Sequence, residues 1–380
     1  MWKRYASAVF LVICFSACQA PEENRVKAIV GAVLIDGAGG PPLTDSVIVV
    51  AGDRFREVGS RSNIIVPQGA DTIDGSGKTI VPGLIDIYAR VPEPGERNLN
   101  SFLDLGIVAV CNSGGKLDFA ARQAERDGRL MTTRLLTAGN SFAPPGGTSE
   151  NPPSVFQPST VEQASAEVAE LAGKKVDAIH IFMEDSPRAG SKAWREIAAA
   201  VLEAARNAGI PAVGHIFRQA DAEFLVDNGV SGLIGVIRDP ELNPNLVTRL
   251  RDLRVFFAPT LTQAQGATAE LATAERNVRR LFAAGVPIAV SSGGGSASDY
   301  RRQLELLAEA GVPPMDVIAA ATRNGAVALR QQEEFGAIQP GKRADFLILT
   351  ANPGADIRNL QRIDRMMFDG EWVDRTRLKR

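Results

Sequence analysis

The chain has 380 residues, of which 45% are hydrophobic and 23% charged, so it is large enough for one barrel-sized domain and a small second domain. The formal net charge is −2 at pH 7 and the basic residues are scattered, which argues against a nucleic-acid partner. The cysteines, Cys14, Cys18 and Cys111, are too few for a disulfide framework.

The first twenty residues have the pattern of an export signal. Lys3 and Arg4 precede an apolar run over residues 6–15, which is too short to span a bilayer as a stable helix. The segment Phe15-Ser16-Ala17-Cys18 resembles a bacterial lipobox, which predicts cleavage before Cys18 and acylation of that residue. We therefore expect an exported cell-envelope lipoprotein, held in outer-membrane lipid and facing the periplasm, with residues 19–26 as a polar tether. The alternative is an ordinary cleaved signal with an incidental cysteine.

Short β-strands are predicted near both ends of the chain. Residues 28–34, 46–50 and 55–58 are apolar and β-branched and are separated by turn residues, with Asp53-Arg54 at a hairpin tip. Another hairpin turns at Asp369-Gly370 near the C-terminus. We expect residues 27–80 and 337–380 to form one composite β-sandwich around a central domain over residues 81–336.

The central part alternates short apolar runs with helical stretches, which predicts an α/β fold. One helix is predicted over residues 194–208, because Trp194, Ile197 and Val201 recur at helical spacing. The number of candidate strands is that of a (β/α)8 TIM-type barrel. The candidate strands cover residues 80–87, 107–111, 134–138, 178–182, 212–215, 232–236, 255–258 and 287–291.

Two segments carry a family resemblance. Val81-Pro82-Gly83-Leu84-Ile85-Asp86-Ile87-Tyr88-Ala89-Arg90 resembles the first barrel strand of the metal-dependent amidohydrolase superfamily, in its imidazolonepropionase-like branch, and residues 338–349 resemble a C-terminal strand of that superfamily. The resemblance covers nearly the whole chain after the export signal. It implies the barrel with its composite β-sandwich, and a family activity of metal-dependent hydrolysis of C–N bonds in non-peptide or dipeptide substrates.

The resemblance also assigns the family's metal-ligand positions, which lie at the carboxyl ends of barrel strands. Only the fifth-strand histidine is retained, as His215. The other positions are substituted: the first-strand histidine pair falls on Tyr88 and Arg90, the fourth-strand lysine on His180, the sixth-strand histidine on Gly235, the eighth-strand aspartate, which is the general base, on Gly293, and a further histidine on Thr148.

These substitutions predict a pocket without the family's metal centre. A hydrolytic zinc site needs about three protein ligands and an open position for water, but at most two imidazoles remain. Arg90 cannot ligate and adds a permanent positive charge. An alternative is one divalent metal such as zinc, held weakly by His180, His215 and a carboxylate such as Asp86 or Glu184.

Other chemistry at the strand ends is also conceivable. Ser291, Ser292 or Cys111 could act as a nucleophile with His215, although no nucleophile-elbow pattern surrounds them. The loop Ser291-Ser292-Gly293-Gly294-Gly295-Ser296 precedes a predicted helix and could bind a carboxylate or phosphate through backbone N–H groups. The structural alternative for this loop is a turn that tolerates glycine. For Tyr88 the alternative is a side chain that fills the space of the family's metals, and for His180 and His215 it is imidazoles hydrogen-bonded inside the barrel mouth.

The sequence therefore predicts a degenerate amidohydrolase-like protein that binds a small ligand, anionic ligands included, in a metal-free pocket lined by Tyr88, Arg90, His180, His215 and Ser291 to Gly294. One alternative is an active hydrolase with a reduced or relocated metal site. Another is a structural envelope lipoprotein or a partner subunit of an active paralogue. The partners left open are a second copy of the chain, as a homo-oligomer, and a paralogue.

Overall fold

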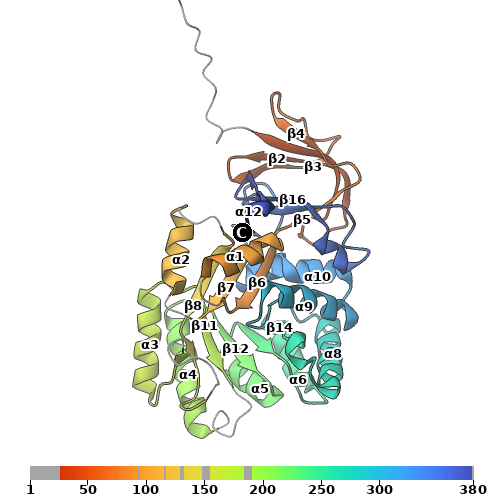
Figure 1. Cartoon of the computed structure of the whole chain (residues 1–380). Coiled ribbons are helices and arrows are strands. Elements are labelled where there is room, and N and C mark those ends of the chain that lie inside the picture. The colour runs from red at the N-terminus through yellow and green to blue at the C-terminus, as the bar shows by residue number, and fades with distance from the viewer. Residues whose placement is uncertain are drawn as a thin grey trace, which may run out of the picture.

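The computed structural model describes residues 26–91, 95–114, 117–128, 132–147, 155–183 and 191–378. A β-sheet made from both ends of the chain covers one end of an α/β barrel (Figure 1). The predicted export signal and Cys18 lie outside the described residues. Within those residues, no helix is long and apolar enough to cross a membrane.

Strands from both chain ends form one eight-stranded sheet, in the order β17-β16-β15-β5-β1-β2-β3 with β4 beside β1. The two ends meet where β5 pairs antiparallel with β15. Bulges between Val30 and Leu34 interrupt the pairing of β1 with β2. The strands are β1 (Lys27–Leu34), β2 (Leu43–Ala51), β3 (Arg54–Ser60), β4 (Asp71–Asp74), β5 (Thr79–Pro82), β15 (Phe346–Leu349), β16 (Ile363–Phe368) and β17 (Glu371–Trp372).

The barrel is built from parallel strands in two hydrogen-bonded groups, β6-β7-β8 and β9-β11-β12-β13-β14, with β10 beside β9. One junction closes through the Asp177 N–H, which donates to the Thr137 carbonyl at 2.8 Å. The strands are β6 (Leu84–Ala89), β7 (Ile107–Ser113), β8 (Arg134–Gly139), β9 (Ser141–Phe142), β10 (Val155–Phe156), β11 (Ile179–Phe182), β12 (Ala212–Ile216), β13 (Gly232–Gly235) and β14 (Phe256–Pro259).

The eighth predicted strand, over residues 287–291, is not a regular strand. This segment forms only an isolated bridge, between Ile288 and Phe257 of β14. It still closes the barrel, because the Val290 carbonyl accepts a hydrogen bond from the Ile87 N–H of β6 at 3.2 Å. The barrel predicted from the sequence is therefore confirmed, with its last strand irregular.

Helices surround the barrel strands and turn apolar faces toward them. In α4 (Lys192–Asn207), Trp194, Ile197 and Val201 are buried, as their spacing predicts. The other helices are α1 (Gly95–Asp104), α2 (Leu117–Arg126), α3 (Val161–Gly173), α5 (Gln219–Asp227), α6 (Pro244–Asp252), α7 (Leu261–Ala264), α8 (Thr268–Ala283), α9 (Ala297–Glu309), α10 (Pro314–Ala321), α11 (Arg323–Ala328), α12 (Arg375–Leu378) and the 3₁₀ helix η3 (Ile357–Gln361).

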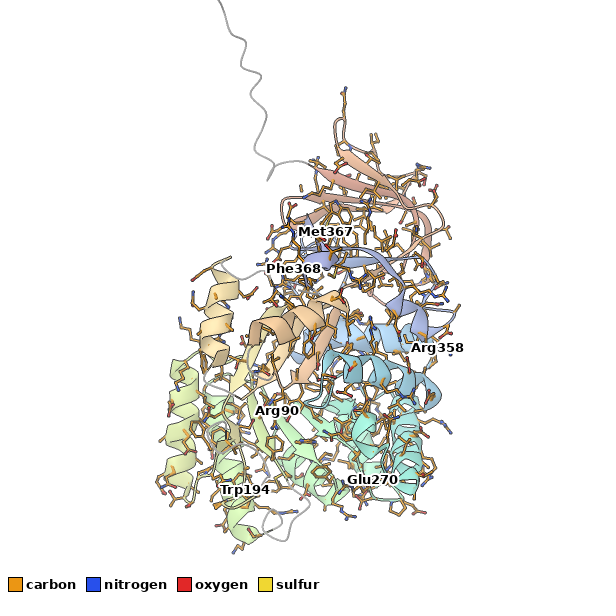
Figure 2. All side chains as sticks on the ribbon, viewed as in Figure 1. Arg90, Trp194, Glu270, Arg358, Met367 and Phe368 are labelled. Carbon is orange, nitrogen blue, oxygen red and sulfur yellow. The ribbon has the colours of Figure 1, made fainter. Side chains whose placement is uncertain are left out.

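The terminal sheet is fastened to the amino ends of the barrel strands. Arg134, the first residue of β8, forms ion pairs with Asp345 at 2.9 Å and with Asp369 at 2.5 Å, and both carboxylates belong to the C-terminal segment. The opposite end of the barrel, where Arg90 follows β6, is left for a functional site (Figure 2).

The predicted first strand over residues 80–87 is in fact two strands in two sheets, because the chain changes sheets at Gly83. Residues before Gly83 pair in β5 and those after it in β6. A Cβ atom at Gly83 would lie only 2.4 Å from Cγ1 of Val108 on β7. Glycine is therefore required where the chain passes closely over the barrel wall.

We expect Gly83→Ala to lower the free energy of unfolding by about 1–3 kcal/mol, because the added methyl group overpacks against a valine held in a strand. Urea denaturation at neutral pH measures the change. Gly40→Ala is the matched control, since a Cβ atom there meets nothing within 4 Å. Equal stability of the two variants would contradict this account of Gly83.

Candidate functional site

Three of the predicted residues come together at the carboxyl ends of the barrel strands. Tyr88 comes from β6, His180 from β11 and His215 from β12. The ring centroid of Tyr88 lies 5.1 Å from that of His180 and 5.8 Å from that of His215. The tyrosine ring thus packs against both imidazoles.

Both imidazoles are enclosed and neutral. None of their four ring nitrogens has a hydrogen-bond partner among the described residues, and all four are buried. Burial, with a smaller effect of His215, lowers the pKa of His180 from 6.5 to about 3. Burial, followed by the charges of Arg90 and Arg238, lowers the pKa of His215 from 6.5 to about 4. At neutral pH each ring therefore offers one N–H donor and one acceptor nitrogen.

Two phenylalanines that the sequence analysis missed flank His215. The rings of Phe182 and Phe217 each lie 5.2 Å from the imidazole, centroid to centroid. Arg238 stacks on Phe217 at 4.5 Å from the ring centroid and forms an ion pair with Glu270 at 2.8 Å. Phe182 and Phe217 each lie two residues after a histidine, so the period-two alternation of a strand could have identified them.

The residues at the sixth strand leave no place for another ligand. Gly235 has a φ of +129°, and a Cβ atom on it would lie 2.1 Å from the carbonyl oxygen of Ile216. No side chain fits there without moving the backbone. Within the described ranges, no group of three or more His, Cys, Asp or Glu side chains is arranged to hold a metal ion. Thr148 and Glu184 lie outside those ranges.

At the general-base position, the backbone conformation and the close neighbours also favour glycine. Gly293 has a φ of +70°, and a Cβ atom there would lie 3.0 Å from Cγ2 of Thr260. The Gln263 side-chain amide donates to the Gly293 carbonyl at 2.7 Å. Thr260 and Gln263 follow the seventh strand, so examining every strand end for polar residues could have found them. Among the described residues, the donor set therefore does not fit the metal centre that the family resemblance implies.

The glycine loop uses its N–H groups internally. The N–H of Gly294 donates to the Tyr88 carbonyl at 3.2 Å, and that of Gly295 to the Ser292 carbonyl at 3.2 Å. Helix α9 begins at Ala297, after the N-cap Ser296, and the Asp299 carboxylate accepts from the Ser296 N–H at 2.7 Å. These donors, and a helix start that already has its own carboxylate, are not available to an external anion.

Among the described residues, none of the predicted nucleophiles is hydrogen-bonded to His215. The Ser292 hydroxyl donates to the Tyr88 carbonyl at 3.2 Å. The Ser291 hydroxyl is buried with no hydrogen-bond partner among the described residues, and Cys111 is buried as well. Since neither nitrogen of His215 is hydrogen-bonded to a described residue, the proposed serine–histidine and cysteine–histidine pairs are not formed.

Asp86 connects the first strand to the end of the eighth. One of its carboxylate oxygens accepts from the N–H of Tyr88 at 3.1 Å and from the N–H of Ser292 at 3.0 Å. The other oxygen is buried without a partner among the described residues. Burial raises the pKa of the Asp86 carboxyl from 3.8 to about 6, against the lowering effect of these hydrogen bonds. Asp86 therefore holds the backbone of the site.

Comparison with known proteins identifies relatives over the same stretch of chain. A sequence model of the amidohydrolase family matches residues 96–373. Imidazolonepropionase of Alkaliphilus metalliredigens (strain QYMF) is 24% identical, and the match covers 92% of this chain and 97% of that enzyme.

Solved structures share the whole fold. A putative prolidase from Bifidobacterium longum superimposes with a TM-score of 0.80 at 24% identity, covering 92% of this chain and 95% of its own. Molinate hydrolase superimposes with a TM-score of 0.80 at 19% identity, covering 93% of this chain and 96% of its own. At these identities the likeness shows the barrel and its terminal β domain.

The raised pKa of Asp86 predicts how stability depends on pH. The folded protein holds the Asp86 proton more tightly than the unfolded chain, so the contribution of Asp86 to stability falls as pH rises from 3.8 to about 6, opposite in sign to the contributions of His180 and His215. The full loss is about 3 kcal/mol. We expect Asp86→Asn, which keeps the accepting oxygen, to gain stability relative to the wild type across this interval. Urea denaturation at several pH values, with the exposed Asp71→Asn as control, measures it; parallel curves for wild type and Asp86→Asn would contradict it.

Proposed function

Because this chain belongs to the amidohydrolase family, we propose that it uses the family's barrel to bind a small ligand without the family's binuclear metal centre. The ligand binds at the carboxyl ends of the strands, against Tyr88, His180 and His215. Fold alone does not decide activity, so the proposal depends on the chemistry of these residues.

One observation carries the proposal: the nitrogens of His180 and His215 are buried and have no hydrogen-bond partner among the described residues. A buried polar group without a partner costs about 1–3 kcal/mol. Native proteins rarely leave such groups unsatisfied, so each calls for a bound molecule, a water or an ion. A small ligand with both a donor and an acceptor satisfies two neutral imidazoles.

The surroundings favour a flat ligand with negative charge. Tyr88, Phe182 and Phe217 supply aromatic rings next to the imidazoles. Burial is the main cause of the lowered pKa of His215, and the positive charges of Arg90 and Arg238 lower it further. The same positive potential stabilises an anionic group near that imidazole.

A reduced metal site is the second candidate. Members of this family generally use a divalent metal, and two neutral imidazoles from neighbouring strands can share one ion such as zinc. With Asp86 engaged by two backbone N–H groups, the third ligand for such an ion would have to come from elsewhere. This candidate retains hydrolysis, whereas the first requires only binding.

Ligand binding is tested with benzoate, a flat anion, and benzamide, its neutral counterpart. We expect calorimetry on the full chain to show tighter binding of benzoate. His215→Ala should weaken benzoate binding by about tenfold, because one hydrogen bond to a charged group is lost. The distant surface variant Arg249→Gln should bind like wild type. Equal benzoate affinity in wild type and His215→Ala, with both folded, would reject the proposed pocket.

Metal content separates the two candidates. We expect elemental analysis of protein purified without chelators to find well below one zinc or manganese ion per chain. We also expect Tyr88→His combined with Arg90→His not to create a stoichiometric site, because Gly235 and Gly293 still supply no ligand. Stoichiometric metal in the native protein, together with turnover of dipeptides or cyclic amides that chelation abolishes, would favour the hydrolase instead.

A further inference from the structure

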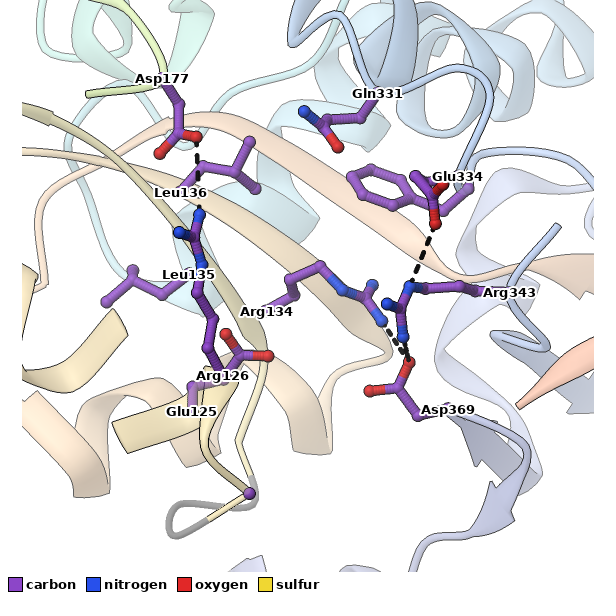
Figure 3. Close-up of a pocket in the computed structure, with 12 residues that line it drawn as sticks. Glu125, Arg126, Arg134, Leu135, Leu136, Asp177, Gln331, Glu334, Arg343 and Asp369 are labelled. Carbon is purple, nitrogen blue, oxygen red and sulfur yellow. Dashed lines mark hydrogen bonds and ion pairs between the residues drawn. The ribbon is translucent and has the colours of Figure 1, made fainter. Parts of the chain in front are cut away.

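A second cavity lies at the other end of the barrel, between the amino ends of the strands and the terminal sheet (Figure 3). It has a volume of about 440 Å³, within the range of small-molecule sites. Tyr88, His180 and His215 are not among the residues that line it. The side chains that matter for its chemistry are Glu125, Arg126, Arg134, Gln331, Glu334 and Arg343.

One wall of the cavity is held rigid by ion pairs. Arg134 is paired with Asp345 and Asp369, and its guanidinium packs between the rings of Phe335 and Phe368, at 5.1 and 5.0 Å from their centroids. Arg343 pairs with Asp369 at 2.8 Å, as the dashed lines in Figure 3 show. The charges of Arg134 and Arg343 are neutralised by their ion-pair partners. This wall therefore gives the cavity its shape but offers few free charged groups to a ligand.

The other wall, formed by α2, carries two charged side chains that can contact a ligand. Burial raises the pKa of the Glu125 carboxyl, against the lowering effect of the charges of Arg134 and Arg126 and of a hydrogen bond from the backbone of Leu135. Arg126, the next residue of α2, is half-exposed and contacts Asp177 only loosely, at 3.8 Å. A carboxylate and a guanidinium from the same helix turn therefore line one cavity, each able to take an oppositely charged group.

The balance of charge selects the ligand class. The lining contains four acidic side chains, Glu125, Asp177, Glu334 and Asp369, and three basic ones, Arg126, Arg134 and Arg343. A ligand with one strong charge would face like charges on the opposite side, whereas a zwitterion meets both signs favourably. Leu135, Leu136 and Phe335 supply apolar surface next to these charges.

We propose that this cavity is a second binding site, for a small zwitterion of the α-amino acid type with an apolar side chain. Glu125 receives the ammonium group and Arg126 the carboxylate, while the apolar side chain packs on Leu135, Leu136 and Phe335. The site is independent of the barrel mouth, and it joins α2 and β8 of the barrel to the C-terminal segment that carries Arg343 and Asp369.

L-Leucine is the probe, and calorimetry on the full chain is the measurement. We expect L-leucine to bind, and leucinamide and 4-methylpentanoate, each with one of its charges, to bind at least about tenfold more weakly. Glu125→Gln and Arg126→Gln should each weaken L-leucine binding by about the same factor. The exposed variants Glu196→Gln and Arg280→Gln are charge-matched controls and should bind like wild type.

The barrel-mouth variant His215→Ala identifies which site is occupied. Unchanged L-leucine affinity in this variant, with loss in Glu125→Gln, supports the cavity. Loss in His215→Ala with retention in Glu125→Gln assigns the amino acid to the barrel mouth and overturns the proposal. Absence of L-leucine binding to the wild type at concentrations on the order of 10 mM also overturns it, since an affinity weaker than that amounts to less than about 3 kcal/mol.

Discussion

The enclosure of two neutral imidazoles at the barrel mouth is the constraint on which the chemistry of this protein depends. His180 and His215 are buried deeply enough to lose their charge at neutral pH, and their nitrogens have no hydrogen-bond partner among the described residues. A neutral imidazole without a partner can accept a hydrogen bond or bind a metal ion through its unprotonated nitrogen, and can donate through the other. Nearby Arg90 and Arg238 add positive charge instead of electron pairs.

The backbone enforces this constraint as much as the side chains do. At Gly235 even a methyl group would collide with the Ile216 carbonyl, and at Gly293 it would press against Thr260. Asp86, the carboxylate nearest the site in sequence, is occupied in holding the N–H groups of Tyr88 and Ser292. Backbone contacts between segments far apart in the chain thus fix the site around Gly235, Gly293 and Asp86.

The two ends of the barrel carry different chemistry on one fold. The carboxyl end encloses aromatic rings and neutral imidazoles, whereas the amino end is lined by ion pairs such as Arg134–Asp369 that tie the terminal sheet to the barrel. In barrel proteins, residues at the amino ends of the strands normally contribute to stability, and functional sites lie at the carboxyl ends. Here the ion pairs border the cavity lined by Glu125 and Arg126, for which we propose a zwitterionic ligand.

The sequence by itself determined the barrel, the strand-rich ends and the identity of the residues at most strand ends, because alternation, helical spacing and turn residues are local properties. It placed Tyr88, His180 and His215 at strand ends but could not show that their rings touch. Only the tertiary structure decided that the first strand divides at Gly83. It also decided that N–H groups of the glycine loop donate to the carbonyls of Tyr88 and Ser292, and that the Gln263 side chain donates to the Gly293 carbonyl. Each of these depends on contacts between segments far apart in the chain, for which one-dimensional patterns carry no signal.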